Sequence, residues 1–423
     1  MEGLVKGLLN VAFGDDDREK KREEDEIDER SRSTSWAQVV SGDKDDDDED
    51  EQKYSRNSNR RNEEEKNEQW GSGGSNTYRR PQQAVNDYNQ RHPDQQTEEE
   101  NNDGWETVGK KKPAKKHQQV QKDNWENFKR PANEQEYSNE VSHTSQMEPS
   151  EDELNDLSQA CNKLWELDYN RLTPGQDYEI DCGEGKKTYQ KQDMAEGSLF
   201  TWLSEDVLKK PTISRFCSLL DNYNPHEGYK EQVTSQEKQE QAGFIEEICR
   251  TAPIIYLFKY LCAKGIVSHD YAEFKGLLTS LWFDLYGRGG TSSCSSAFEH
   301  VFVGEIKSRG EQSVSGFHNW LQFYMEEAKG RVNYQGYIFP RRRGETPDSE
   351  SQLLTIQFEW NGVLKSVSST MIGVSPEFEI ALYTLCFYMG GEENHVELGP
   401  YSVNIKCYHL GTKLGSAFPV ADS

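Results

Sequence analysis

The sequence predicts an α+β fold, in which a helix-rich N-terminal sub-domain is followed by a mainly β sub-domain. Three observations support this prediction. The composition changes sharply near residue 150, apolar residues then recur at helical spacing as far as residue 286, and strand-like alternation with turn signals dominates the remainder. We therefore expect a disordered, charged tail over 1–150 and a folded domain over 151–423.

The tail is predicted from its composition. The chain carries a formal net charge of -26 and only 33% of its residues are hydrophobic. Residues 1–150 contain long charge blocks such as "GDDDREKKREEDEIDERSR", which cannot bury enough apolar surface to offset the entropy lost on ordering. Within this tail, Trp36 and Trp105 share the pattern Trp-x-x-Val followed closely by Gly. The two motifs are either protein-binding sites or a chance recurrence, and we expect protein partners there.

The elements of the folded domain follow from local patterns. Residues 151–170 place leucines and Trp165 at helical spacing, and a glycine- and serine-rich break follows residue 286. After this break, Asn361-Gly362 is typical of a two-residue hairpin turn. The patterns predict helices at 151–170, 197–220, 236–264, 269–286, 319–329 and 376–389, and strands around 300–306, in a hairpin over 353–369 and in a final pair over 401–419.

The predicted hairpin places Lys365 on a face whose other residues are apolar. A two-residue turn at Asn361-Gly362 sets Phe358 opposite Lys365, and residues on one face of the hairpin then alternate with those on the other. Burying an ammonium group among apolar side chains is costly unless it has a partner. Lys365 therefore either extends past the edge of the sheet or is held where an anion binds. The predicted face comprises Ile356, Phe358, Trp360, Val363, Lys365 and Val367.

Two histidines add the means for acid–base chemistry. His300 begins a run that is typical of a strand, and His318 stands where a helix begins. Two imidazoles and a lysine suffice to cleave RNA: one takes the proton of the ribose 2′-hydroxyl, the other protonates the leaving 5′-oxygen, and the lysine offsets phosphoryl charge. The helix N-terminus would favour a neutral His318. Spacing alone is equally compatible with two ordinary structural histidines.

Four blocks of sequence make the predicted function more specific. They resemble the EndoU family of uridylate-specific endoribonucleases, in the family's order and across essentially all of 151–423. The resemblance implies an EndoU-like fold and cleavage of single-stranded RNA at uridines by 2′-hydroxyl attack, leaving 2′,3′-cyclic phosphate and 5′-hydroxyl ends. The blocks are "LSQACNKLWELDYNRLTPGQDY" (157–178), "FEHVFVGEIK" (298–307), "GFHNWLQFY" (316–324) and "GSAFP" (415–419).

The resemblance also assigns roles to residues. It implies that His300 and His318 are the catalytic pair, that Lys365 is the third catalytic residue, and that Glu299 and Glu305 support activity. It implies Mn2+ as cofactor. The ligand types of Glu299, His300 and Glu305 suit that ion, but a strand would send Glu299 and His300 to opposite faces. The metal ligands therefore stay unassigned.

The chain departs from the family's pattern near its C-terminus. Where the family places a serine or threonine that recognises uracil, this chain has Cys407 followed by Tyr408. We expect these two residues at the substrate-binding position, although a thiol hydrogen-bonds less well than a hydroxyl. Strict uridine preference is thus less secure than cleavage, and a catalytically weak RNA-binding module of the same fold stays open as the alternative. A metal-dependent phosphodiesterase would differ from both by also cutting 2′-deoxy substrates.

The sequence also sets expectations for location and assembly. It contains no recognisable signal peptide and no apolar stretch long enough to span a membrane. We therefore expect an intracellular protein, cytoplasmic or nuclear, with reduced cysteines, which acts as a monomer on single-stranded, U-containing RNA.

Overall fold

The computed structural model describes residues 135–139, 141, 147–289, 292–307, 310–340 and 346–421. The predicted tail as far as residue 134, including the Trp36 and Trp105 motifs, lies outside these residues. Within the described ranges the α+β prediction is confirmed, since helices dominate the first part and sheets the second. None of the helices in these ranges is both long and apolar enough to cross a bilayer.

The helices of the first part are shorter than predicted because capping residues interrupt them. The predicted 151–170 helix breaks at Asp156, whose carboxylate accepts the Ser158 N–H at 2.8 Å and so begins a second helix. The predicted 236–264 helix breaks at Thr251, two residues before Pro253, which lacks the N–H needed inside a helix. The helices are α4 (Glu151–Asn155), α5 (Leu157–Leu167), α6 (Pro211–Leu219), α7 (Ser235–Ile248), α8 (Ala252–Ala263) and α9 (Tyr271–Phe283).

The prediction of one helix over 197–220 was wrong. The segment forms strand β3 (Phe200–Leu203), paired antiparallel with β1 (Tyr178–Ile180), before a 3-10 turn and α6. A long-range contact explains the difference. The backbone N–H groups of Leu199 and Phe200 donate to the buried Glu327 carboxylate at 2.7 and 3.2 Å, so that tertiary structure satisfies them in an extended conformation.

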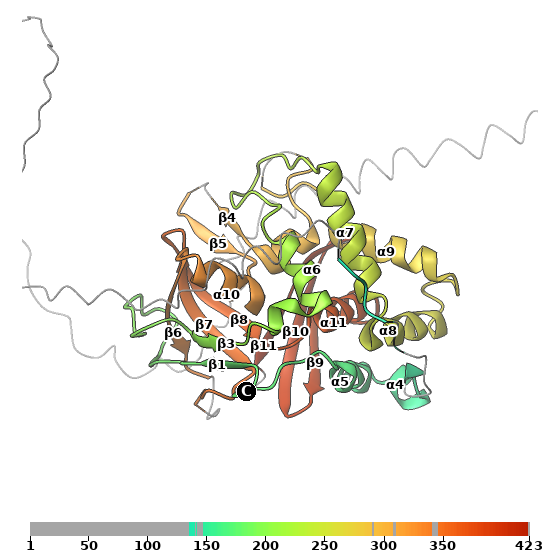
Figure 1. The fold of residues 1–423 in the computed structure, drawn as a ribbon, viewed down its shortest axis with the longest axis horizontal. Coiled ribbons are helices and arrows are strands. Elements are labelled where there is room, and N and C mark those ends of the chain that lie inside the picture. Colours follow the sequence, from blue (N-terminus) through green and yellow to red (C-terminus); the bar gives the residue numbers. More distant parts are fainter. Residues whose placement is uncertain are drawn as a thin grey trace, which may run out of the picture. The chain divides into compact units, whose positions relative to one another are not determined.

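Two larger sheets form the second part. The hairpin β7 (Leu353–Trp360) and β8 (Val363–Met371) joins β6 (Val332–Ile338) and β2 (Gly185–Lys186) in the order β2-β6-β7-β8. The second sheet has the order β11-β10-β9 and comprises β9 (Glu393–Leu398), β10 (Tyr401–Leu410) and β11 (Lys413–Ala421). Figure 1 shows helices α4, α5, α8 and α9 gathered on one side and the β6–β8 strands on the other.

The predicted hairpin register is confirmed next to the turn and fails farther from it. Phe358 lies opposite Lys365, as the Asn361-Gly362 turn requires. A β-bulge then shifts the pairing, so that Ser368 and not Val367 lies opposite Ile356. The extra residue in β8 therefore moves a hydroxyl onto the face that was predicted to carry Val367.

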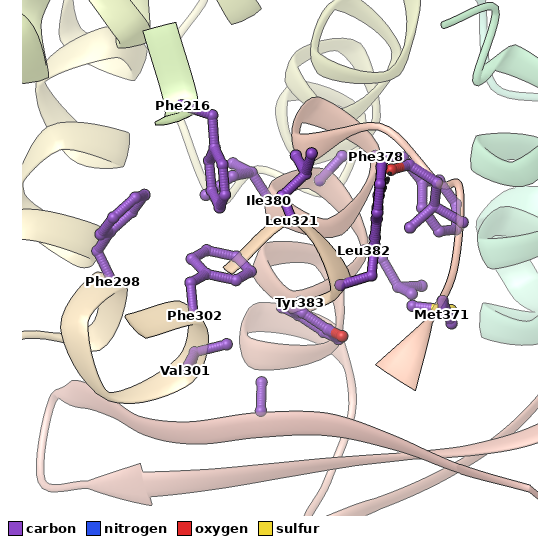
Figure 2. Close-up of a cluster of buried hydrophobic side chains, with 14 of the residues drawn as sticks. Phe216, Phe298, Val301, Phe302, Leu321, Met371, Phe378, Ile380, Leu382 and Tyr383 are labelled. Carbon is purple, nitrogen blue, oxygen red and sulfur yellow. Dashed lines mark hydrogen bonds between the residues drawn. The ribbon is translucent and has the colours of Figure 1, made fainter. Parts of the chain in front are cut away.

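The core forms around α11 (Pro376–Met389), which matches its predicted range and is almost entirely buried. Figure 2 shows Tyr383 of this helix beside Val301 and Phe302. Phe302 also contacts Phe216 of α6, with ring centroids 5.3 Å apart, and stacks on Trp282 of α9 at 5.1 Å. This packing fixes the segment around residue 300 against both the helices and α11.

Residues ahead of α4 also pack on the helices. The ring of Tyr137 lies 4.2 Å from the guanidinium of Arg215 and 5.0 Å from that of Arg250. The backbone N–H of Ser138 lies 3.3 Å from the carboxylate of Glu247, which forms a buried ion pair with Arg215. These contacts anchor the described residues around Tyr137 on α6 and α7.

Candidate active site

His300 lies on a short helix, and the predicted strand at this position was wrong. Residues Glu299–Val303 form one turn of π-helix, η5, which is closed by a 2.8 Å bond from the Gly304 N–H to the Glu299 carbonyl. Phe298, Val301 and Phe302 have helical spacing and all enter the core, which an extended strand would not allow. Single π-helical turns are often found at functional sites.

His318 lies in a loop that is bonded directly to η5. This loop precedes α10 (Trp320–Ala328). The N–H of His318 donates to the Val301 carbonyl at 3.0 Å, and the N–H of Phe317 donates to the His300 carbonyl at 3.3 Å. A Cβ on Gly316 would lie 1.7 Å from the His300 carbonyl oxygen, so only glycine permits this approach. The two histidines are therefore held together by their own backbones.

A buried carboxylate orients the His300 ring. His300 Nδ1 lies 2.6 Å from Glu305 Oε2, and Arg288 Nε lies 3.6 Å from the same oxygen. The carboxylate selects the tautomer with its proton on Nδ1, which leaves Nε2 for chemistry. Burial, with the charges of Arg288 and Lys365, lowers the pKa of His300 well below its usual value. Burial raises the pKa of Glu305, and Arg288 opposes that shift.

Glu299 and Glu305 do not form a metal site with His300. Burial, reinforced by Glu305 and Glu231, raises the pKa of Glu299 to about 10, so this side chain is a neutral acid at pH 7. Glu305 already binds His300 and Arg288. Across the described ranges, no group of three His, Cys, Asp or Glu side chains is arranged to hold a metal ion. Glu299, His300 and Glu305 therefore do not form a Mn2+ site by themselves in the part of the chain that the structure describes.

The His318 ring has a different set of neighbours. Its Nδ1 lies 3.2 Å from the Ser369 carbonyl and 3.3 Å from the Ser368 hydroxyl, which the β-bulge brings to this place. The carbonyl can only accept, so Nδ1 carries the proton and Nε2 holds a lone pair. The ring stacks on Phe418, with centroids 4.4 Å apart. Burial and the charge of Lys365 lower the pKa of His318 well below its usual value.

Lys365 is the third predicted catalytic residue, and it lies near the two histidines. It is only 8% exposed, and its amine lies 3.4 Å from the Val314 carbonyl. Within the described part of the chain no carboxylate forms an ion pair with it. Burial and the nearby Lys307 lower the pKa of Lys365 to about 7. The charge of Lys365 in turn lowers the pKa of both His300 and His318, so the three predicted catalytic side chains converge in space.

The structure does not bring Cys407 to this site. Cys407 is fully buried on the face of β10 that packs on α11, where burial and the neighbouring Cys386 raise the pKa of its thiol. Tyr408 lies on the opposite face with Ser416 and Phe418, and the rings of Tyr408 and Phe418 are 6.2 Å apart. Sequence reasoning missed Ser416 and Phe418. Their i, i+2 spacing in "GSAFP" was the available signal, because it puts both on one face of a strand.

The hydrogen bond between His300 and Glu305 leads us to predict the effect of removing the Glu305 charge. We expect Glu305→Gln to lower the single-turnover rate by about tenfold or more, because the amide stabilises the protonated imidazole of His300 less well. The variant keeps the side-chain volume and should fold. Quench-flow cleavage assays would measure the rate, and NMR titration of the His300 ring would follow its pKa. An unchanged rate and an unchanged titration would contradict the role of Glu305.

Two imidazoles with defined tautomers beside a buried lysine form a site that is suited to acid–base chemistry next to an anion. The family model described as "Endoribonuclease XendoU" matches residues 156–419, more than half of the sequence, and the chain belongs to this family. It is 41% identical to the uridylate-specific endoribonuclease B of Danio rerio, over 63% of this chain and 95% of the relative. It is 40% identical to the poly(U)-specific endoribonuclease-A of Xenopus laevis, over 63% of this chain and 93% of the relative.

A solved structure supports the fold. The structure of XendoU, described as a splicing-independent snoRNA processing endoribonuclease, aligns with a TM-score of 0.57 and 39% sequence identity. The alignment covers 63% of this chain and 97% of that one. The predicted EndoU-like fold is therefore confirmed.

Proposed function

We propose that the chain is a uridylate-specific endoribonuclease that cleaves single-stranded RNA through attack by the ribose 2′-hydroxyl. The observation that carries the proposal is the convergence of His300, His318 and Lys365 in a member of the XendoU family. The names of the relatives support uridine as the preferred base. The products would be a 2′,3′-cyclic phosphate and a 5′-hydroxyl.

The environments of the two imidazoles suggest different roles. His318 is neutral and faces a carbonyl through Nδ1, so its Nε2 suits the general base that takes the 2′-hydroxyl proton. In the free protein, burial and the charges of Arg288 and Lys365 lower the pKa of His300, but a bound phosphate would offset those two charges. The Glu305 carboxylate would then stabilise a protonated His300, so His300 suits the general acid. In this scheme the 2′-oxygen bonds to phosphorus, the bond from phosphorus to the 5′-oxygen breaks, and His300 delivers a proton to that oxygen.

Lys365 would stabilise the charge on the phosphoryl oxygens. Its pKa of about 7 reflects burial without a counter-charge, and an incoming phosphate supplies that charge. The interaction strengthens as negative charge builds up in the transition state. The burial of Lys365 therefore supports a role in binding the phosphoryl group.

The uracil base would be read on the face of β10 and β11 that carries Phe418. An aromatic ring offers a stacking surface to any base, and the Ser416 hydroxyl can both donate and accept hydrogen bonds. Tyr408, on the same face, adds a second ring. Dependence on Mn2+ stays an expectation from the family relation, and no step of the scheme is routed through a metal.

A chimeric substrate tests the proposal. The protein is incubated with a short RNA containing one uridine, with and without Mn2+, beside a copy with 2′-deoxyuridine at that position. We expect cleavage of the first only, after uridine, with a cyclic phosphate end detectable by mass spectrometry. Cleavage of the deoxy copy at the same site would identify a metal-dependent phosphodiesterase instead. Binding without cleavage of either would identify an RNA-binding module.

The proposal extends to location. All eight cysteines are free thiols and seven of them are buried, which supports an intracellular site of action.

A further inference from the structure

Glu379 is a buried carboxyl group that takes no part in the proposed acid–base scheme. It lies on α11 and is 1% exposed. Its Oε2 accepts a hydrogen bond from Asn319 Nδ2 at 2.6 Å, and its Oε1 accepts one from the Tyr383 hydroxyl at 3.1 Å. Both oxygens are therefore engaged, and one partner, Asn319, directly follows His318 in the chain.

Asn319 is connected through Gln322 to the π-helical turn that carries His300. Its Oδ1 accepts the N–H of Gln322 at 3.0 Å and caps α10. Gln322 Nε2 in turn donates to the carbonyl of Val303, the last residue of η5, at 3.1 Å. Asn319 and Gln322 are 1% and 2% exposed, so water does not compete for these bonds. A continuous polar chain thus links Glu379 on α11 to both histidine-bearing segments.

The loop that carries His318 has a conformation that is unfavourable on its own. Phe317, next to His318, has a positive φ of 65°, which a non-glycine residue adopts only when its surroundings impose it. The far end of the chain is rigid, because Tyr383 lies in the packed core around α11 (Figure 2). Losing Glu379 would leave the buried donors of Asn319 and Tyr383 unsatisfied and free the Asn319 side chain to rotate.

We propose that Glu379 is a positioning residue that sets the placement of His318 relative to His300, acting through Asn319 and Gln322. The inference rests on the proposed function, since it concerns the geometry of that acid–base pair. Proton transfer requires its groups within hydrogen-bond reach, so a small displacement lowers the rate of the chemical step more than it lowers RNA binding.

The full-length variant Glu379→Leu tests this proposal on the single-uridine RNA. We expect kcat to fall at least tenfold with KM changed less than threefold. Glu379→Gln, which keeps one acceptor for Asn319, should recover part of the loss. In a His318→Ala background the same Glu379→Leu change should have little further effect on the single-turnover rate, because there is no imidazole left to position.

A matched control separates positioning from stability. Glu327 is similarly buried, at 3% exposure, and its carboxylate also accepts two hydrogen bonds, from Leu199 and Phe200. It lies near the end of α10, whereas His318 precedes the start of that helix. Glu327→Leu should lower the melting temperature to a similar extent while leaving kcat near the wild-type value at temperatures where both variants are folded.

Three outcomes would overturn the proposal. These are a wild-type kcat in Glu379→Leu, an equal loss in the His318→Ala background, or an equal loss of kcat in Glu327→Leu. If Glu379→Leu does not fold, Glu379→Gln decides by the same comparisons. An inactive wild-type protein would instead refute the proposed function.

Discussion

Replacing His300 or His318 with alanine is expected to lower the turnover of a uridine-containing RNA by about a hundredfold to ten-thousandfold, the usual contribution of a general acid or base. Each imidazole carries out one of the two proton transfers. The described hydrogen-bond partners of His318 Nδ1 are a carbonyl and a hydroxyl, and neither could replace the imidazole as a base near pH 7. Single-turnover cleavage with enzyme in excess would measure residual rates.

The pair should also act as a unit. Because base and acid serve one concerted step, the double variant should lose far less than the product of the two single losses. His395→Ala is the control, since this side chain is 60% exposed and faces Glu393 on the surface. A near-normal rate in either His300→Ala or His318→Ala would show that the pair is wrongly assigned.

Replacing Lys365 with methionine is expected to have opposite effects on activity and stability. We expect turnover to fall by about a hundredfold to a thousandfold, as when a charge-stabilising group is removed from an active site. The free protein should become more stable by about 1 kcal/mol or more, because methionine fills the space without a buried, unpaired ammonium. Cleavage assays and thermal unfolding would measure the two effects.

The pH dependence of unfolding provides an independent readout of Lys365. Burial lowers its pKa from 10.5 to about 7, so between these values the unfolded chain binds more protons than the folded one. Stability therefore rises with pH across this window, and Lys365→Met should flatten that rise. Lys413→Met, on the surface beside Asp284, is the control. Equal or lower stability of Lys365→Met, with an unaltered pH profile, would contradict the assignment.

Elements defined by local signals were predictable from sequence. The Asn361-Gly362 turn fixed the pairing of Phe358 with Lys365, because a two-residue loop leaves one register. The helix over 376–389 was also recovered, since its apolar residues are continuous and Pro376 starts it. Strands β6 and β9 were not predicted. Strand β6 pairs with β2 and β7, which lie far from it in sequence, whereas β9 pairs with β10, which follows directly after Gly399-Pro400.

The sequence predicted which residues form the site better than it predicted where they lie in the fold. His300 was placed on a strand, although the i, i+3, i+4 spacing of Phe298, Val301 and Phe302 was compatible with the helix that forms. Cys407 was chosen for base recognition, but β10 turns it towards α11. The alternation of side chains assigns the residues of a strand to two faces, but it does not show which face is buried. The element that packs on the sheet determines which face is buried.

By itself, the sequence determined which side chains could do the chemistry: two histidines, a lysine beside a hairpin turn and two glutamates, within blocks that resemble an endoribonuclease family. Their protonation states and relative positions were decided only by the tertiary structure. Burial shifts the pKa of Glu299 to about 10 and that of Lys365 to about 7, and removing water requires the whole fold. The backbone bonds from the His318 loop to η5, and the chain from Glu379 to Asn319, likewise join segments that only folding brings together.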